Sequence, residues 1–257
     1  MVVKSMTQRI WLWLLVTGVL LLLLTEVFPW GHAVDMWFTQ LLYDDATGRF
    51  VLLHKGWAEK YLHNLPQNVL RIVPVYMLIQ VAYGGYLKWK IGLSAVQHEV
   101  WRRWIGLLAG AVATVVVVNL IKSQTNVACP WDLKPFGGEW TYVDLFTARP
   151  WAPKVIKCWP AGHGAAGFSI IAVAFVMGWP AAMWQKKLAA GDDRMPAWLG
   201  AKAFVWYALF LSTALGAVRI LQGGHFLSHH LWALWWVLVV LMILVEFGVI
   251  KKRWLND

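Results

Sequence analysis

Charged side chains are scarce in this sequence, and long runs of apolar residues take their place. Only 14% of the 257 residues are Asp, Glu, Lys or Arg, whereas soluble chains carry about 25%. Hydrophobic residues make up 60%, and 20 residues are tryptophan. This balance excludes an ordinary soluble domain and indicates a membrane protein. The net charge of +10 does not indicate nucleic-acid binding, because the basic residues lie beside the apolar runs and form no separate basic domain.

Internal repeats and low-complexity tracts are also lacking, so we expect residues 1–257 to form a single membrane-embedded domain. Six apolar runs approach the roughly 20 residues that a helix needs to cross a bilayer. They are 9–29, 68–88, 102–121, 163–184, 201–218 and 230–250. The first run lacks a small-residue cleavage site and is longer than the apolar core of a signal peptide, so we expect a retained helix. The sequence predicts an all-α, polytopic integral membrane protein with six transmembrane helices in a bundle.

Lysine and arginine are distributed unevenly between the loops that join these runs. With the N-terminus in the cytoplasm, the loops on that side carry many basic residues and few acids. Because cytoplasmic loops are enriched in Lys and Arg, we expect both termini in the cytoplasm. The outward-facing loops are then 31–67, 122–162 and 219–229.

The first outer loop contains apolar residues at helical spacing, in DMWFTQLLYDD and in RFVLLHKGWAEKYLHNL. Amphipathic helices of this kind lie in the membrane interface. We expect amphipathic interfacial segments here, either as a surface cover or as a lid over a lipid headgroup.

Cysteine is nearly absent. The two that exist, Cys129 and Cys158, both fall in the second outer loop and allow a single pairing. An extracytoplasmic loop lies in an oxidising compartment, where disulfides persist, so we expect a bond; a pair of buried free thiols is the alternative. The bond would contribute about 3 kcal/mol by restricting the unfolded chain. It would also tie the residues after Lys122 to those before His163.

Four ionisable residues lie at the outer ends of the expected helices, namely Lys122, His163, Arg219 and His225. If these ends converge, two cations and two imidazoles surround one spot. Arg and Lys together suit a phosphate, and Gly162 would let a ligand approach the backbone closely. One imidazole could attack phosphorus while the other protonates the leaving oxygen. Acidic residues do not cluster here, so a divalent metal is not implied.

A zinc site is the rival interpretation of the histidines. His163, His225, His229 and His230 could ligate zinc, but two neighbouring cations would repel the ion. The stretch HFLSHH also lacks a carboxylate or thiolate at a familiar spacing. We therefore expect no metal. Each histidine could also have no functional role and lie in the membrane interface, hydrogen-bonded to water. This alternative applies mainly to His229 and His230.

Three short motifs resemble those of the type 2 phosphatidic acid phosphatase superfamily. That family carries Lys, six residues and Arg-Pro; then Pro-Ser-Gly-His; then Ser-Arg, five residues, His, three residues and Asp. Here Lys122 precedes CP at 129–130, PAGH stands at 160–163, and AVRILQGGHFLSH covers 217–229. The resemblance implies His225 as nucleophile, forming a phosphohistidine, and His163 as general acid. It implies that Lys122, Arg219 and the backbone at Gly162 bind the phosphoryl oxygens, without metal or organic cofactor.

The activity implied by the resemblance is that of a metal-independent phosphatase acting on a phosphorylated membrane lipid. Candidate substrates are an isoprenyl pyrophosphate, phosphatidylglycerol phosphate, phosphatidic acid or a lipid A type glycolipid. Alternatives are a lipid phosphotransferase on the same scaffold, or a membrane protein that binds or transports such lipids without chemistry. We expect location in a cell membrane, in a bacterium the inner membrane, with the active site on the extracytoplasmic or periplasmic side.

This sequence departs from the family motifs at four positions. Cys129 replaces the Arg of the first motif, Ala161 and Val218 replace two Ser, and His229 replaces the Asp. Candidates for the missing cation are Lys134, Arg149 and Lys157. The missing Asp would accept a hydrogen bond from the second ring N–H of His225. A neutral His229 or His230 could accept this bond instead, and Asp132, Glu139 or Asp144 could supply the negative charge.

Overall fold

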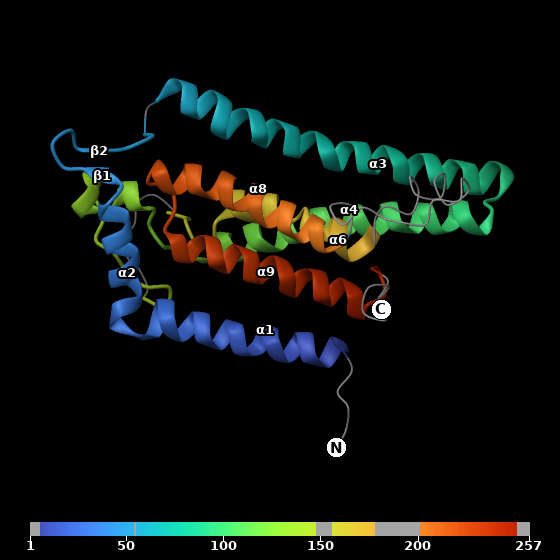
Figure 1. The fold of residues 1–257 in the computed structure, drawn as a ribbon, viewed down its shortest axis with the longest axis horizontal. Coiled ribbons are helices and arrows are strands. Elements are labelled where there is room, and N and C mark those ends of the chain that lie inside the picture. The colour runs from blue at the N-terminus through green and yellow to red at the C-terminus, as the bar shows by residue number, and fades with distance from the viewer. Residues whose placement is uncertain (1–5, 54, 148–155, 178–200, 251–257) are drawn as a thin grey trace, which may run out of the picture.

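Helices make up most of the structure, a computed structural model that describes residues 6–53, 55–147, 156–177 and 201–250 (Figure 1). The long helices are α1 (Met6–Leu22), α3 (Leu65–Ile91), α4 (Ala95–Gln124), α8 (Ala201–Leu221) and α9 (Leu227–Glu246). The shorter ones are α2 (Pro29–Gln40), α5 (Gly162–Phe168) and α6 (Ile171–Met177). The π-helical segment η1 (Leu23–Val27) follows α1, and a second one, η2 (Ala58–Asn64), precedes α3. Two short 3-10 helices, η3 (Pro130–Asp132) and η4 (Lys134–Phe136), lie between α4 and α5. A short hairpin pairs β1 (Tyr43–Asp44) with β2 (Arg49–Phe50). The prediction of a mostly helical protein is confirmed.

Four of the helical segments are long and apolar enough to cross a membrane: Thr7–Val27, Ala58–Ile91, Ala95–Gln124 and Leu227–Glu246. They coincide with four of the six expected runs, and this indicates membrane integration. Shorter apolar helices, Gly162–Val173 and Trp206–Leu221, lie within the other two runs. The second half of the run 163–184 lies outside the described residues, so the six-span topology stays a prediction.

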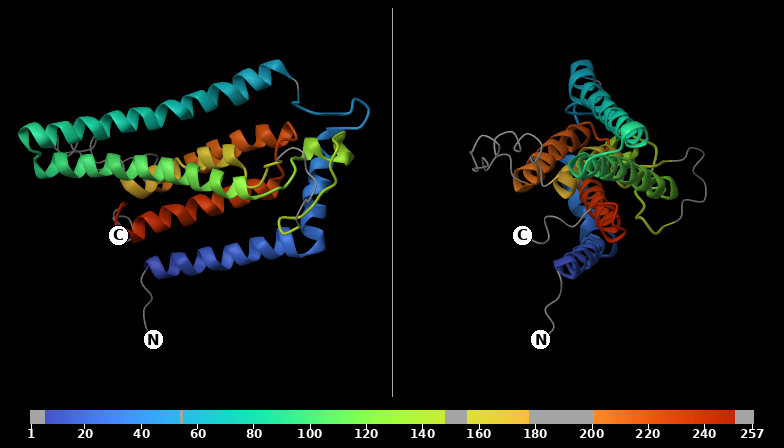
Figure 2. Two further views of the ribbon diagram at one scale, coloured as in Figure 1. Left: turned by 180° about the vertical axis from the view of Figure 1, so that it is seen from behind. Right: turned by 90° about the vertical axis from the view of Figure 1, so that its right-hand side faces the viewer.

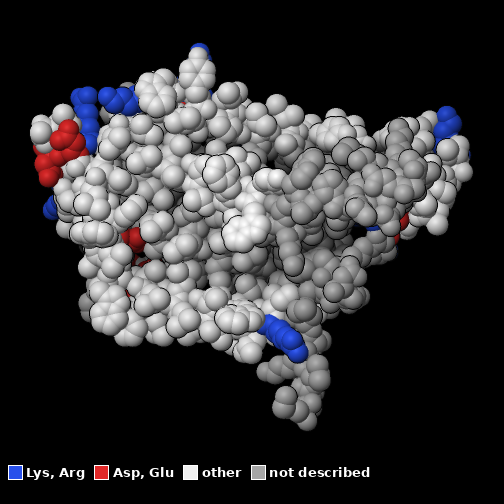
Figure 3. Space-filling model, in the orientation of Figure 1, with Lys and Arg blue, Asp and Glu red and all other residues white. Residues whose placement is uncertain are grey.

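The helix bundle has a core and two flanking helices. Helices α4, α5, α6, α8 and α9 pack against one another, while α1 and α3 lie on opposite sides of them (Figure 2). Small side chains allow the close packing: a Cβ at Gly110 would lie 2.8 Å from that of Ala172. In this view, most charged side chains of the described residues lie toward the two ends of the long axis, and the described surface between the ends is largely uncharged (Figure 3). Such an uncharged surface is what a lipid bilayer requires.

Helix α4 has well-defined ends, which fix where its polar residues fall. Ser94 caps its N-terminus in a capping box with Gln97, because each side chain accepts a hydrogen bond from the other residue's backbone. At the other end, Thr125 Oγ1 donates to the Trp159 carbonyl across 2.7 Å. The last turn of α4, with Lys122, is thereby held beside the chain that enters α5.

A cap of short elements covers one end of the bundle, where α2 runs across the helix ends (Figure 1). Its own apolar cluster includes Phe50, Leu133, Phe136 and Phe226. The predicted disulfide between Cys129 and Cys158 is present in this cap, with their Cα atoms 5.2 Å apart.

The first outer loop differs from the expectation in its second half. Residues from Ala58 onward form the helical segment η2, which continues directly into α3, so this helix begins about ten residues before the expected run 68–88. Polar side chains at Glu59, His63 and Gln67 interrupt the apolar pattern here, which is why the sequence favoured an interfacial segment. The side chains of His63 and Gln67 line a cavity inside the protein.

Candidate active site

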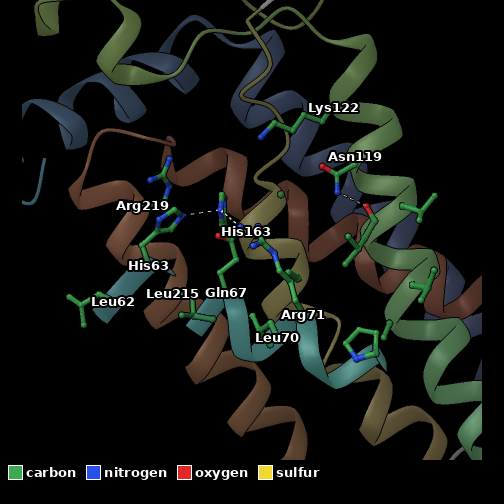
Figure 4. Close-up of a pocket in the computed structure, with 17 residues that line it drawn as sticks. Leu62, His63, Gln67, Leu70, Arg71, Asn119, Lys122, His163, Leu215 and Arg219 are labelled. Atoms are coloured by element: carbon green, nitrogen blue, oxygen red, sulfur yellow. Dashed lines mark hydrogen bonds between the residues drawn. The ribbon is translucent and has the colours of Figure 1, made fainter. Parts of the chain in front are cut away.

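A cavity of about 430 Å³ opens at the capped end of the bundle, and it brings together residues of all the motifs (Figure 4). Lys122 comes from the last turn of α4, Gly162 and His163 begin α5, and Arg219 comes from the last turn of α8. All four line the cavity. The size lies within the range of small-molecule sites, about 300–1,000 Å³.

Lys122 faces the start of α5. A Cβ at Gly162 would lie 3.8 Å from Lys122 Nζ and 3.5 Å from Asn119 Oδ1. A side chain at position 162 would therefore narrow the space between the ammonium group and the backbone. Glycine leaves room for an anion at this point.

Arg219 is held by two side-chain contacts. Its guanidinium group lies 4.9 Å from the centre of the Trp131 ring, and its NH1 group donates to Gln222 Oε1 across 2.9 Å. A Cβ at Gly224 would lie 3.0 Å from Arg219 NH2, and Gly223 has a φ of +73° that other residues rarely adopt. The two glycines after Gln222 thus allow the chain to turn tightly around the guanidinium group.

His225 lies in this turn and is buried, with 4% of its surface exposed. It does not line the cavity; its ring centre lies 6.4 Å from that of His163, behind the cavity wall. Its Nδ1 atom lies 3.3 Å from Cys158 Sγ. Burial, followed by the positive charge of Lys122, lowers the pKa of His225 well below its ordinary value. The ring is therefore neutral at physiological pH.

The two following histidines are both buried, but they differ in their surroundings. His229, at the position of the family's Asp, has its ring centre 6.0 Å from that of His225, and its carbonyl accepts from Ala161 N–H across 3.0 Å. This bond ties the second motif to α9. His230 packs between helices, because Cβ atoms at Gly164 and Gly216 would lie 2.4 Å and 2.0 Å from its ring. His230 is thus a packing residue.

The zinc interpretation finds little support in the described part of the chain. The potential ligands that lie within 4.8 Å of one another are Cys158, His225 and His229, and neither His163 nor His230 belongs to this group. Cys158 is also bonded to Cys129. A disulfide sulfur is not the thiolate that zinc binds.

Side chains from the η2–α3 segment complete the cavity, and the sequence interpretation missed them. His63, Gln67 and Arg71 line it, together with Asn119 of α4. The Nε2 atoms of His63 and Gln67 each lie 3.0 Å from His163 Nε2 (Figure 4). A detectable signal existed: Glu59, His63, Gln67 and Arg71 are spaced by four residues, which places polar side chains on one helix face.

Of the proposed substitutes for the missing motif residues, the lysines and acidic residues in the described part of the second outer loop do not line the cavity. Lys134 and Lys157 are exposed and do not line the cavity, and Arg149 lies outside the described residues. Asp132 accepts a hydrogen bond from Trp131 Nε1–H, and Asp144 accepts one from Thr147 Oγ1–H. The third acidic residue, Glu139, is exposed. Arg71 is the additional cation at the cavity, and Cys158 is the neighbour of His225 Nδ1.

The fold and the site together indicate a membrane-integrated protein with a cationic, histidine-containing pocket at the helix ends. The family model of the PAP2 superfamily matches residues 103–253, more than half of the chain. The chain belongs to the PAP2 superfamily, which is the family that the motifs indicated. Membership indicates a phosphatase or phosphotransferase that acts on phosphorylated substrates, and members are generally metal-independent phosphatases. Comparisons with curated proteins and with solved structures found no match for the chain.

Proposed function

We propose that the protein removes phosphate from a phosphorylated membrane lipid, with His225 as nucleophile and His163 as general acid. The observation that carries this proposal is the convergence of Lys122, His163 and Arg219 on one cavity, with His225 directly behind them. Phosphoryl transfer depends mainly on positioning and on charge stabilisation, and this arrangement offers both.

Three cations would bind the phosphoryl group. Lys122 and Arg219 occupy the family positions, and Arg71 lines the same cavity from α3. Arginine offers a planar fork of donors that matches phosphate oxygens. We propose that Arg71 takes the place of the first-motif arginine, whose position is occupied by the disulfide-bonded Cys129.

The environment of His225 supports its role as nucleophile. A disulfide sulfur carries no proton, so His225 Nδ1–H donates to Cys158 Sγ and the lone pair of the ring lies on Nε2. The lowered pKa keeps that lone pair unprotonated. In the proposed reaction, Nε2 attacks phosphorus, His163 protonates the leaving oxygen, and water then hydrolyses the phosphohistidine.

The rest of the cavity supports a lipid substrate. Below the polar end, its lining is apolar and comes from α3, α4 and α8, with Leu70, Pro74, Val112, Val115 and Leu215. These residues lie in or beside the apolar helices that are long enough to span the membrane. A hydrocarbon chain fits this lining, while its phosphate reaches the cations. We propose that this end of the bundle faces the extracytoplasmic side, as the Lys and Arg distribution predicts, and that the disulfide persists there.

Binding without hydrolysis is the second candidate function. The burial of His225 behind the cavity wall favours it, because phosphorus must reach bonding distance of Nε2 for any reaction. In the catalytic case, the side chains that separate the cavity from His225 must shift and open the path.

A substrate panel with purified, detergent-solubilised protein tests the proposal. The panel contains dioctanoyl phosphatidic acid, a short-chain phosphatidylglycerol phosphate and farnesyl pyrophosphate, assayed for phosphate release and for transfer to a second lipid. We expect release by the wild type and none by His225→Ala, with lipid binding retained in the variant. Transfer to an acceptor lipid would assign a phosphotransferase, and binding without turnover in the wild type would overturn the enzymatic proposal.

A further inference from the structure

A row of polar side chains connects His163 to the protein surface. His63 Nδ1 lies 2.7 Å from Glu59 Oε1, and His63 Nε2 lies 3.0 Å from His163 Nε2. The exposed fraction of the side chain is 47% at Glu59 and 13% at His63. The row therefore leads from a half-exposed carboxylate, through a nearly buried imidazole, to the proposed general acid.

Glu59 is itself held in place from the other side of the site. Its second carboxylate oxygen accepts from Gln222 Nε2 across 3.1 Å, and Gln222 Oε1 accepts from Arg219 NH1 across 2.9 Å. One hydrogen-bonded network thus joins the proposed acid to the phosphate-binding arginine. A network that satisfies its members in this way holds them in one geometry.

The hydrogen bonds assign the protons in the row. An ionised carboxylate only accepts, so His63 Nδ1–H donates to Glu59. Gln67 Nε2–H donates to His163 Nε2, which makes this nitrogen an acceptor. His63 Nε2 lies 3.0 Å from the same nitrogen, so a proton on His63 Nε2 would point directly at His163. His163 keeps its proton on Nδ1, a buried atom with no hydrogen-bond partner among the described residues.

We propose that Glu59 and His63 are positioning residues that form a proton path to His163. This inference deepens the proposed phosphatase function and rests on it. When the bond between phosphorus and the leaving oxygen breaks, His225 Nε2 bonds to phosphorus and the leaving oxygen takes the Nδ1 proton of His163. His63 passes its Nε2 proton to His163 Nε2, so both rings are then neutral. When water attacks the phosphohistidine, its proton enters at His163 Nδ1, and the Nε2 proton returns to His63.

The charges around the site explain why the proton is stored one residue away from the chemistry. Arg71 of α3, Lys122 of α4 and Arg219 of α8 line the cavity with His163, and each of these cations opposes a positive charge on that ring. The carboxylate of Glu59 compensates a positive charge on His63 instead. A neutral His163 that receives each proton from His63 avoids adding a fourth positive charge beside the phosphate.

Two substrates with different leaving groups test the proton path. An alkoxide leaving group, as in dioctanoyl phosphatidic acid, needs protonation, whereas the nitrophenolate of p-nitrophenyl phosphate leaves without it. In His63→Gln, we expect kcat for the lipid to fall about 100-fold, because general acid catalysis contributes about 10²–10⁴-fold. We expect kcat for the nitrophenyl ester to fall less than about threefold, since that reaction bypasses the acid.

Glu59→Gln provides a second, milder variant, because the amide oxygen can still accept from His63 Nδ1–H. We expect it to retain the wild-type Tm and to lower kcat for the lipid less than His63→Gln does, because the amide still holds the His63 ring but carries no negative charge. The matched control is Lys60→Gln, an exposed neighbour on the same turn, which should keep both rates and the pH profile.

The outcomes separate the two levels of the proposal. If the wild type releases phosphate from neither substrate, the phosphatase function fails. If the wild type is active and His63→Gln slows both substrates equally, or leaves kcat and the pH profile unchanged, the proton path is wrong and the function stands.

Discussion

His225 Nδ1 lies 3.3 Å from Cys158 Sγ, so the ring of the proposed nucleophile contacts the disulfide of the cap. In the family motif an Asp stands four residues after this histidine, and here the position holds His229. A sulfur accepts a hydrogen bond more weakly than a carboxylate, but it can still select the tautomer in which Nε2 attacks. The disulfide would then have two roles, as a covalent constraint on the loop and as a neighbour of the reacting ring.

Two single variants separate these roles. Cys129→Ala and Cys158→Ala both break the disulfide, but only the second removes the sulfur beside His225. We expect Cys158→Ala to lower kcat about tenfold more than Cys129→Ala, because loss of orientation at a reacting group can cost about 100-fold. Steady-state kinetics, with unreduced mass spectrometry of the wild type to verify the bond, provides the measurement. Equal losses would leave the disulfide with its constraining role alone.

Arg71 should contribute to phosphate binding. Hydrogen bonds to a charged group contribute about 1.5–3 kcal/mol, so we expect Arg71→Gln to lower kcat/KM by about 10- to 150-fold. The matched control is Arg49→Gln, which removes an exposed cation of the β-hairpin outside the cavity. A loss of the same size in the control would point to general attraction of anionic lipids instead of a specific contact.

Asp35 should make the stability of the protein depend on pH. It is 7% exposed, accepts from Ser228 N–H across 3.1 Å and from Ser228 Oγ–H, and burial raises its pKa from 3.8 to about 6. Because the pKa in the folded state is the higher one, the stabilisation is complete below about pH 4 and is lost as the pH rises through about 6. A rise of this size corresponds to about 3 kcal/mol.

The variant Asp35→Asn isolates this contribution. The amide stays neutral and can still accept from Ser228 N–H, so we expect a Tm at pH 7.5 equal to or above that of the wild type. At pH 4.5, the Tm should be equal to or below that of the wild type. Thermal unfolding in detergent at both pH values is the measurement. A Tm that drops at pH 7.5 would show that the ionised form stabilises the start of α9.

Gly216 should be intolerant of a side chain. A Cβ at this position would lie 2.0 Å from His230 Cε1, so we expect Gly216→Ala to destabilise the fold by about 1–3 kcal/mol. Gly56→Ala is the control, because a Cβ there has no neighbour within 4 Å. Combining Gly216→Ala with His230→Ala should recover part of the loss, as residues in contact are coupled. Strict additivity in unfolding measurements would exclude the contact.

The motif residues of the site could be predicted from the sequence because their spacing and their place at helix ends are local properties. Lys122, His163 and Arg219 each stand within one turn of a helix end, and helices of equal span bring such ends to one depth. The disulfide followed from the presence of only two cysteines, and the structure confirms it. Family membership followed from three weak motifs in the correct order, and it is confirmed as well.

The contributions of the first hundred residues could not be predicted in the same way. Glu59, His63 and Arg71 form a helical stripe, but the same spacing is typical of a surface helix, and only tertiary packing decides which face is enclosed. The contact between His225 and Cys158 depends on the turn made by Gly223 and Gly224 and on the fold of the cap. Such a contact joins residues that are far apart in the sequence, and no local sequence pattern predicts it.

The placement of η2 and α3 has a practical consequence for protein engineering. The segment 103–253 matches the superfamily, yet His63, Gln67 and Arg71 stand before it. A chimera that transplants only the matched segment into another scaffold would contain His163 and His225 but would lack the side of the cavity that α3 forms. Exchanges meant to preserve turnover should therefore move α3 together with α4, the partner against which it packs.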